Sequence, residues 1–109
     1  MINRRFSPRF PLRREITLSL PENAAQPALL LDISLGGAGI LVSFSAEAGS
    51  TVYFNAQLPL SDSARDFSAQ CRIATVQKLK ATESHVLGLE FMNISDLHRK
   101  HLAQFVRHY

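Results

Sequence analysis

Five arginines lie within the first fourteen residues of the chain, with no acidic residue among them. This segment carries a charge of +5, whereas the residues from Glu15 onward sum to −2. An arginine guanidinium can form paired hydrogen bonds with a phosphate or with the O6 and N7 edge of guanine. Three residues separate Arg5 from Arg9, and Pro8 stiffens the backbone before the second arginine. The segment therefore predicts an anionic partner: a nucleic acid, a membrane surface or a phosphate-bearing ligand.

A second group of candidate residues interrupts the apolar run "LDISLGGAGILV" at residues 31–42. Asp32 and Ser34 are two apart on an extended segment, which predicts that their side chains point the same way. Asp can accept hydrogen bonds from a guanine base, and Ser can donate to a phosphate or brace the turn. Gly36 and Gly37 permit positive φ and close approach of a ligand to the backbone. The alternative is an Asx or Ser/Thr turn that satisfies only its own backbone.

No catalytic or metal-binding set is recognisable in the sequence. The glycines do not match a dinucleotide fingerprint or a phosphate-binding loop, and Ser34 does not stand in the Gly-x-Ser-x-Gly pattern of a nucleophile elbow. His98 and His101 could present two imidazoles to a metal from one face of a helix. No Cys or carboxylate ligand accompanies them, so a solvated helix face is the better interpretation. Cys71 is most simply a small core residue. We therefore expect no enzyme, no metal and no cofactor.

Length and composition predict a single small domain. At 109 residues and 46% hydrophobic residues, the chain has enough apolar material for one modest core. It contains no apolar run of the roughly 18 residues that a membrane span needs, and no pattern of a cleaved export signal. The lone Cys71 cannot form an internal disulfide, which is consistent with a reducing compartment. We expect a soluble, cytoplasmic protein with no membrane span.

The elements that must position the candidate residues are strands followed by one helix. Apolar and polar residues alternate, or apolar residues run together, in six strand-like segments: 15–20, 28–33, 38–44, 51–60, 67–79 and 85–91. The fifth segment loses its alternation near residues 74–76, which predicts a bulge.

The last residues of the chain show a helical period instead. Ser95 is a plausible N-cap, and Leu102, Phe105, Val106 and Tyr109 form one apolar stripe. This stripe needs a surface to cover, and the open end of a small antiparallel barrel or sandwich would provide one.

Together, the two groups of candidate residues resemble the PilZ domain family. The matching residues are Arg5 and Arg9 in "RFSPR", and Asp32, Ser34 and Gly37 in "DISLGG". "GLEFMNIS" followed by a helix resembles the closing strand and helix of that family. The resemblance implies an all-β fold, a six-stranded antiparallel β-barrel with a C-terminal amphipathic helix. Residues 1–13 would form an arginine-rich arm, and residues 14–109 the barrel with its helix at 95–109.

The resemblance also implies a receptor for cyclic di-GMP, a bacterial second messenger with two guanines and two phosphates. Arg5 and Arg9 would clamp this ligand from the arm. Asp32 and Ser34 would contact guanine and phosphate, and Gly37 would keep the turn open. We add Arg4 and Gly36 as further ligand-binding residues, because they adjoin the two motifs.

The expected mechanism is that ligand binding orders the arm and presents a changed surface to a protein partner. In the family such partners include flagellar motors and exopolysaccharide synthases, in the control of motility and biofilm formation. The domain would be a monomer or a homodimer. Two alternatives stay open: a PilZ-fold interaction module without nucleotide binding, and a nonspecific polyanion or nucleic-acid binder. The acidic body argues against the second, so we expect no DNA binding.

Overall fold

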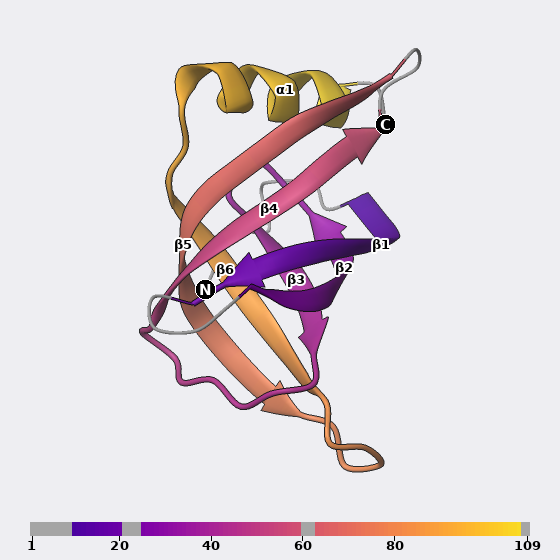
Figure 1. Ribbon diagram of the computed structural model, residues 1–109, viewed down its shortest axis with the longest axis vertical. Helices are drawn as coiled ribbons and strands as arrows, with labels where there is room; N and C mark the ends of the chain where they lie inside the picture. Colours follow the sequence, from indigo (N-terminus) through magenta and orange to yellow (C-terminus); the bar gives the residue numbers. More distant parts are fainter. Residues whose placement is uncertain (1–9, 21–24, 60–62, 108–109) are drawn as a thin grey trace.

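The computed structural model describes residues 10–20, 25–59 and 63–107. Six strands and one helix follow one another along the chain (Figure 1). They are β1 (Phe10–Ser19), β2 (Gln26–Ile33), β3 (Gly37–Val42), β4 (Thr51–Pro59), β5 (Ala64–Lys78), β6 (His85–Asn93) and α1 (Asp96–Arg107). The strands form a closed antiparallel barrel in the order β1-β2-β3-β6-β5-β4. The predicted fold, a six-stranded antiparallel β-barrel with a C-terminal helix, is confirmed.

Apolar side chains from every strand fill the inside of the barrel. Their inward positions recur at every second residue, as on β4, where Val52 and Phe54 are fully buried. Phe54, Phe67 and Phe91 meet edge to face, with ring centroids 5.3–5.9 Å apart. Such aromatic contacts add to the free energy that comes from burying apolar area.

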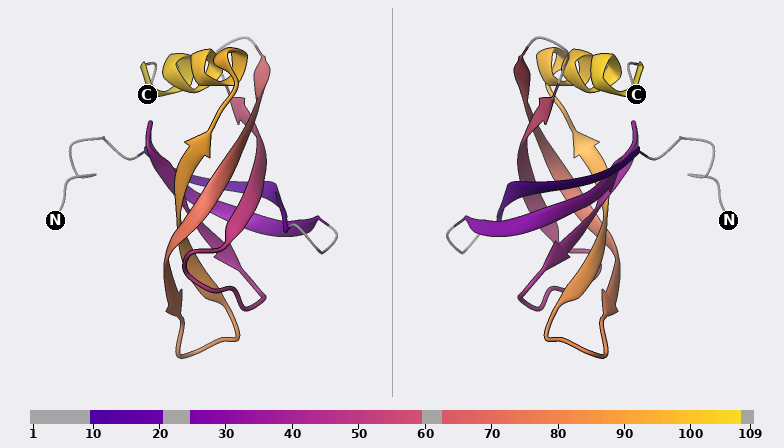
Figure 2. Two further views of the ribbon diagram at one scale, coloured as in Figure 1. Left: turned by 90° about the vertical axis from the view of Figure 1, so that its left-hand side faces the viewer. Right: turned by 90° about the vertical axis from the view of Figure 1, so that its right-hand side faces the viewer.

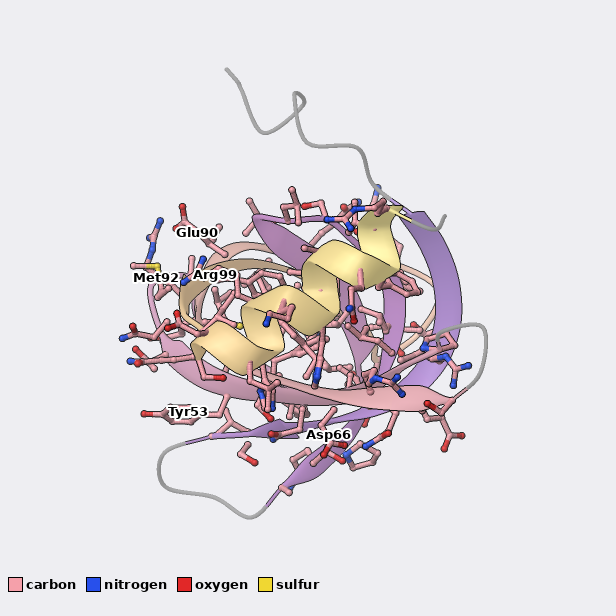
Figure 3. The ribbon with its side chains drawn as sticks, turned by 90° about the horizontal axis from the view of Figure 1, so that it is seen from above. Tyr53, Asp66, Glu90, Met92 and Arg99 are labelled. Atoms are coloured by element: carbon pink, nitrogen blue, oxygen red, sulfur yellow. The ribbon has the colours of Figure 1, made fainter. Side chains whose placement is uncertain are left out.

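Helix α1 covers one open end of the barrel, as Figure 3 shows from above. It begins at an N-cap, since the side-chain oxygen of Ser95 accepts from the backbone N–H of His98 at 3.2 Å. Leu102 and Phe105 point into the barrel and are almost completely buried. Val106 is partly buried against the same core, and Tyr109, the last residue of the predicted stripe, lies outside the described residues. The described part of the stripe therefore closes the core, as expected from the sequence.

Two histidines of α1 cover the edge of β5 that β6 does not reach. The pairing of β6 with β5 stops at Gln70, so residues 64–69 lack a β6 partner. Here Nδ1 of His98 accepts from the backbone N–H of Ser68 at 3.0 Å, and Nδ1 of His101 lies 2.6 Å from the Asp66 carbonyl oxygen. The interpretation of these histidines as a solvated face was therefore wrong. They also belong to no metal-binding cluster within the described ranges.

Strand β1 begins earlier than the sequence predicts. Its pairing with β2 starts at Phe10, opposite Ile33, so residues 10–13 belong to a strand although they were assigned to the arm. A register shift follows between Pro11 and Arg14. Within sheets, proline occurs mainly at edges and beside irregularities such as this one. In β5, by contrast, the predicted bulge is confirmed by a shift between Ile73 and Thr75.

The structure makes a direct prediction for Cys71, whose side chain is fully buried in the barrel. Burial raises the pKa of this thiol from 9.0 to about 12, because the interior disfavours the thiolate. At pH 8 the folded protein should therefore react with iodoacetamide at least about a hundredfold more slowly than the urea-unfolded chain, because the thiolate is the nucleophile. Equal rates would show that Cys71 is accessible in the folded state.

Candidate functional site

Asp32 reaches the outer surface of the barrel because β2 contains a bulge. Strict alternation after the buried Leu30 would turn Asp32 inward. Instead, the register with β3 shifts between Leu30 and Asp32, which leaves Leu31 as an extra residue. As a result Ile33 is buried and Asp32 is only partly buried on the outside. The bulge thus presents a carboxylate within the otherwise apolar run of residues 28–33.

The Asp32 carboxylate is held over β3. Its Oδ1 accepts a hydrogen bond from the backbone N–H of Gly39 at 3.1 Å. A Cβ at Gly39 would lie 3.1 Å from that same oxygen, so the absence of a side chain makes room for the carboxylate. Gly39 is a residue of the site that the sequence analysis did not identify. The only indication of this role in the sequence is that Gly39 follows Gly37 by two residues in the same run.

Ser34 braces the turn between β2 and β3. Its side chain is only 4% exposed, and its backbone N–H donates to the Gly37 carbonyl at 2.8 Å. The O–H of its side chain donates to the same carbonyl at 3.4 Å, and the hydroxyl oxygen accepts from the Gly36 N–H at 3.3 Å. Ser34 lies just beyond the end of β2. It therefore does not follow the strand alternation that predicted its side chain to point the same way as that of Asp32. The two side chains each turn back onto the hairpin backbone.

The two glycines of the turn differ in what they do. Neither has the positive φ expected from the sequence; among the described glycines only Gly49 does, with φ of 92°. A Cβ on Gly37 would collide with the backbone carbonyl of Leu89 on β6, whereas a Cβ on Gly36 would meet nothing within 4 Å. Gly37 is therefore required for the close approach of β3 to β6. Gly36 is open to solvent at the tip of the turn.

Strand β6 holds the turn between β2 and β3 in place. The Gly36 carbonyl accepts from the Phe91 N–H at 3.0 Å, and Gly37 pairs with Glu90. Glu90 in turn forms an ion pair of 2.8 Å with Arg72 on β5, at the surface. Leu35 projects from the tip of the turn and is 51% exposed. The turn is thus anchored on its β6 side and presents Leu35 and Gly36 outward.

The three candidate arginines, Arg4, Arg5 and Arg9, lie outside the described residues. Their connection to the barrel is nevertheless defined, because β1 starts at Phe10, directly opposite Ile33. Covalent geometry keeps the Cα of Arg9 within about 3.8 Å of that of Phe10 and the Cα of Arg5 within about 18 Å. The residue that follows Arg9 in the sequence therefore lies beside the end of β2, next to the Ser34 turn.

Comparison with known proteins agrees with this architecture. The PilZ domain model matches residues 3–108. The chain belongs to the PilZ domain family. No curated protein resembles it closely enough to count as a match.

Several solved structures share the PilZ fold of this chain. The inhibitor of motility MotI/DgrA from Bacillus subtilis has a TM-score of 0.82 and 19% identity over 98% of this chain and 51% of its own. YcgR from Escherichia coli, solved in complex with c-di-GMP, has a TM-score of 0.71 and 20% identity over 98% of this chain and 46% of its own. The chain thus spans about half the length of these two proteins. It covers 91% of the isolated PilZ domain of YcgR, with c-di-GMP, at a TM-score of 0.66 and 18% identity.

The two glycines of the turn provide a matched pair of variants. Gly37→Ala should lower the free energy of unfolding by about 1–3 kcal/mol, because the Leu89 carbonyl is backbone and must shift. Gly36→Ala should change it by less than about 0.5 kcal/mol, since its Cβ would meet only open space. Urea denaturation of both variants measures the difference. Equal losses would contradict a packing role specific to Gly37.

Proposed function

We propose that this PilZ domain is a receptor for cyclic di-GMP. The observation that carries the proposal is the pairing of Phe10 with Ile33, which places the residue that follows Arg9 in the sequence at the same end of β2 as the Asp32 and Ser34 motif. This supports a single site formed by two motif halves that are more than twenty residues apart in the sequence. Both are intact, and the YcgR structure in complex with c-di-GMP has the same fold.

In this proposal the arginines provide the cationic half of the site. Arg5 and Arg9 clamp the ligand through its phosphates and the O6 and N7 edges of its guanines, and Arg4 adds a further contact by charge or stacking. Binding orders the arm against the barrel. The attraction between the arginine guanidinium groups and the anionic ligand offsets the conformational entropy that the arm loses when it becomes ordered.

The barrel side of the proposed site combines one polar contact with a braced turn. Asp32 accepts from the N1–H or N2 amine of a guanine while Gly39 fixes its carboxylate. Ser34 acts mainly through the turn, because its hydroxyl already bonds to Gly36 and Gly37. Gly36 leaves the backbone at the tip of the turn accessible to the ligand.

The proposed output is a change in the surface that the domain shows to a protein partner. Cyclic di-GMP would act through a flagellar motor component, an exopolysaccharide synthase or another regulator of motility or biofilm formation, in the cytoplasm. MotI/DgrA, described as an inhibitor of motility, has the same fold and supports this class of output. In the described part of the chain, no helix is long and apolar enough to cross a membrane.

Calorimetric titration with cyclic di-GMP tests the receptor function. The wild-type protein should give a saturable isotherm, and Arg5→Ala or Arg9→Ala should each weaken binding by about 1.5–3 kcal/mol, the range for hydrogen bonds to charged groups. Arg107→Ala, which removes an exposed arginine at the end of α1, serves as the control and should leave affinity unchanged. Absence of heat and of thermal stabilisation by the ligand would contradict the proposal.

The same titrations separate the receptor from its alternatives. Cyclic di-AMP should bind far more weakly, because adenine offers an amine where guanine offers the O6 acceptor. A nonspecific polyanion binder would instead bind both nucleotides and single-stranded DNA with a steep salt dependence. Hydrogen exchange of residues 1–13 should slow when cyclic di-GMP saturates the protein. Unchanged exchange with binding intact would contradict the ordering of the arm alone.

A second variant tests the role of the carboxylate. Asp32→Asn keeps a side-chain oxygen for the Gly39 N–H and removes the negative charge. We expect binding to weaken by about 1.5–3 kcal/mol, as for other hydrogen bonds to charged groups. The free energy of unfolding should change by less than about 1 kcal/mol, because the neutral hydrogen bond is retained. A large loss of stability with unchanged affinity would show that Asp32 serves the hairpin alone.

A further inference from the structure

The barrel closes through a short seam between β1 and β4. Residues 17–19 of β1 pair with residues 53–55 of β4, and no further pairs join the two strands. Strand β4 continues to Pro59, paired with β5 along its whole length. Along residues 56–59, the edge of β4 that faces β1 therefore has no strand partner among the residues that the structure describes. Such an edge presents backbone groups that can pair with another extended chain.

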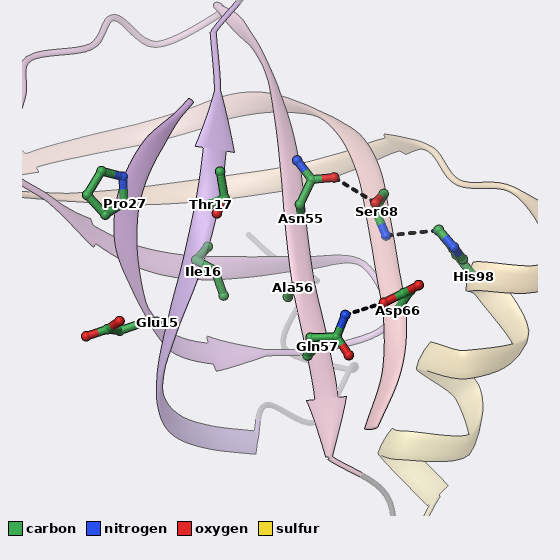
Figure 4. A pocket seen from close by; sticks show the side chains of 10 residues that line it. All are labelled: Glu15, Ile16, Thr17, Pro27, Asn55, Ala56, Gln57, Asp66, Ser68 and His98. Atoms are coloured by element: carbon green, nitrogen blue, oxygen red, sulfur yellow. Dashed lines mark hydrogen bonds between the residues drawn. The ribbon is translucent and has the colours of Figure 1, made fainter. Parts of the chain in front are cut away.

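A groove of about 550 Å³ opens where β1 and β4 diverge (Figure 4). Ile16 and Ala56 contribute apolar surface from the two diverging strands. The groove extends past β5 to His98 at the start of α1. The unpaired edge of β4 thus borders a space that is large enough for a peptide backbone and its side chains.

The wall of the groove is held by its own hydrogen bonds. The Ser68 hydroxyl donates to the Asn55 side-chain oxygen at 2.7 Å, and the Gln57 amide donates to the Asp66 carboxylate. His98 accepts from the Ser68 N–H and so connects the wall to α1 (Figure 4). A wall that is already ordered loses little conformational entropy when a ligand binds.

The charge of the groove is negative. Glu15 and Asp66 both line it and are exposed, and no Lys or Arg belongs to the described residues that line it. Neither carboxylate forms an ion pair within the described ranges of the chain. His98 contributes no positive charge while its Nδ1 accepts a hydrogen bond. The groove therefore favours a cationic occupant.

We propose that this groove binds an extended, basic segment of a partner protein. The segment adds as a short strand to residues 56–59 of β4 and places Lys or Arg side chains beside Glu15 and Asp66. Backbone pairing supplies affinity in this mode of recognition, and the side chains that flank the edge supply specificity. The short free edge accommodates one strand of about four or five residues, close to the usual strand length.

This surface is separate from the proposed nucleotide site. The nucleotide site lies at the Phe10 end of β1, whereas the groove lies near the other end of the strand, about 20 Å away at the usual rise per residue. Figure 2 shows β1 and β2 running side by side across the barrel. The inference does not rest on nucleotide binding, so the two can fail independently.

Nuclear magnetic resonance of the isotope-labelled chain tests the proposal with two defined probes, the capped peptides KVKVKVK and EVEVEVE. The basic peptide should shift the amide signals of residues 15–17 and 55–58, leave those of residues 32–39 unchanged, and slow hydrogen exchange of at least one amide in residues 56–58. The acidic peptide should cause no such changes. Shifts centred elsewhere, or none at millimolar peptide, would overturn the proposal.

Charge variants localise the interaction to the groove. Glu15→Lys should weaken binding of KVKVKVK at least about fivefold, and Asp66→Asn about two- to fivefold, consistent with exposed ion pairs. Glu83→Lys makes the same charge change at an exposed turn between β5 and β6 and should alter affinity less than about twofold. An equal loss in Glu83→Lys would mean that only net charge attracts the peptide, and would overturn the groove assignment.

Discussion

The structure depends on one constraint, that a small closed barrel must be apolar on the inside at every second residue of each strand. Leu30 and Ile33 both satisfy this constraint, although they are three residues apart and alternation would place them on opposite faces. The bulge at Leu31 resolves the conflict and turns Asp32 outward. The core and the candidate site are therefore products of the same irregularity. A regular strand could not bury both apolar side chains and present the carboxylate.

A second constraint acts where β3 meets β6. The turn lies so close to the closing strand that Gly37 can carry no side chain, and the Gly36 carbonyl is bonded to Phe91. The barrel half of the candidate site is thus part of the hydrogen-bonded sheet and is rigid. The arginine half lies on a terminal segment joined to the barrel at Phe10. The hydrogen bonds of Gly36, Gly37 and Gly39 therefore place the barrel half in the sheet, and the proposed arginine half precedes Phe10 in the sequence.

The sequence predicted the features that depend on local pattern. Alternation and helical spacing identified six strands and the helix, and the loss of phase near residue 74 identified the bulge in β5. The features it missed depend on distant segments. The start of β1 at Phe10 depends on pairing with β2. Pro8 and Pro11 made this part of the sequence look unlike a strand. The role of Gly37 depends on the Leu89 carbonyl, and the roles of His98 and His101 depend on where β6 stops.

Strand β1 is the element that the two surfaces share. It pairs with β2 along most of its length, but its connection to β4 is only three residue pairs long. A short ladder has few cooperative hydrogen bonds, and this seam has the fewest residue pairs of the six strand pairings in the barrel. A ligand bound at the proposed site would act on the Phe10 end of β1, the strand that also borders the groove at residues 15–17. In this way β1 connects the side of the barrel next to the Ser34 turn with the groove.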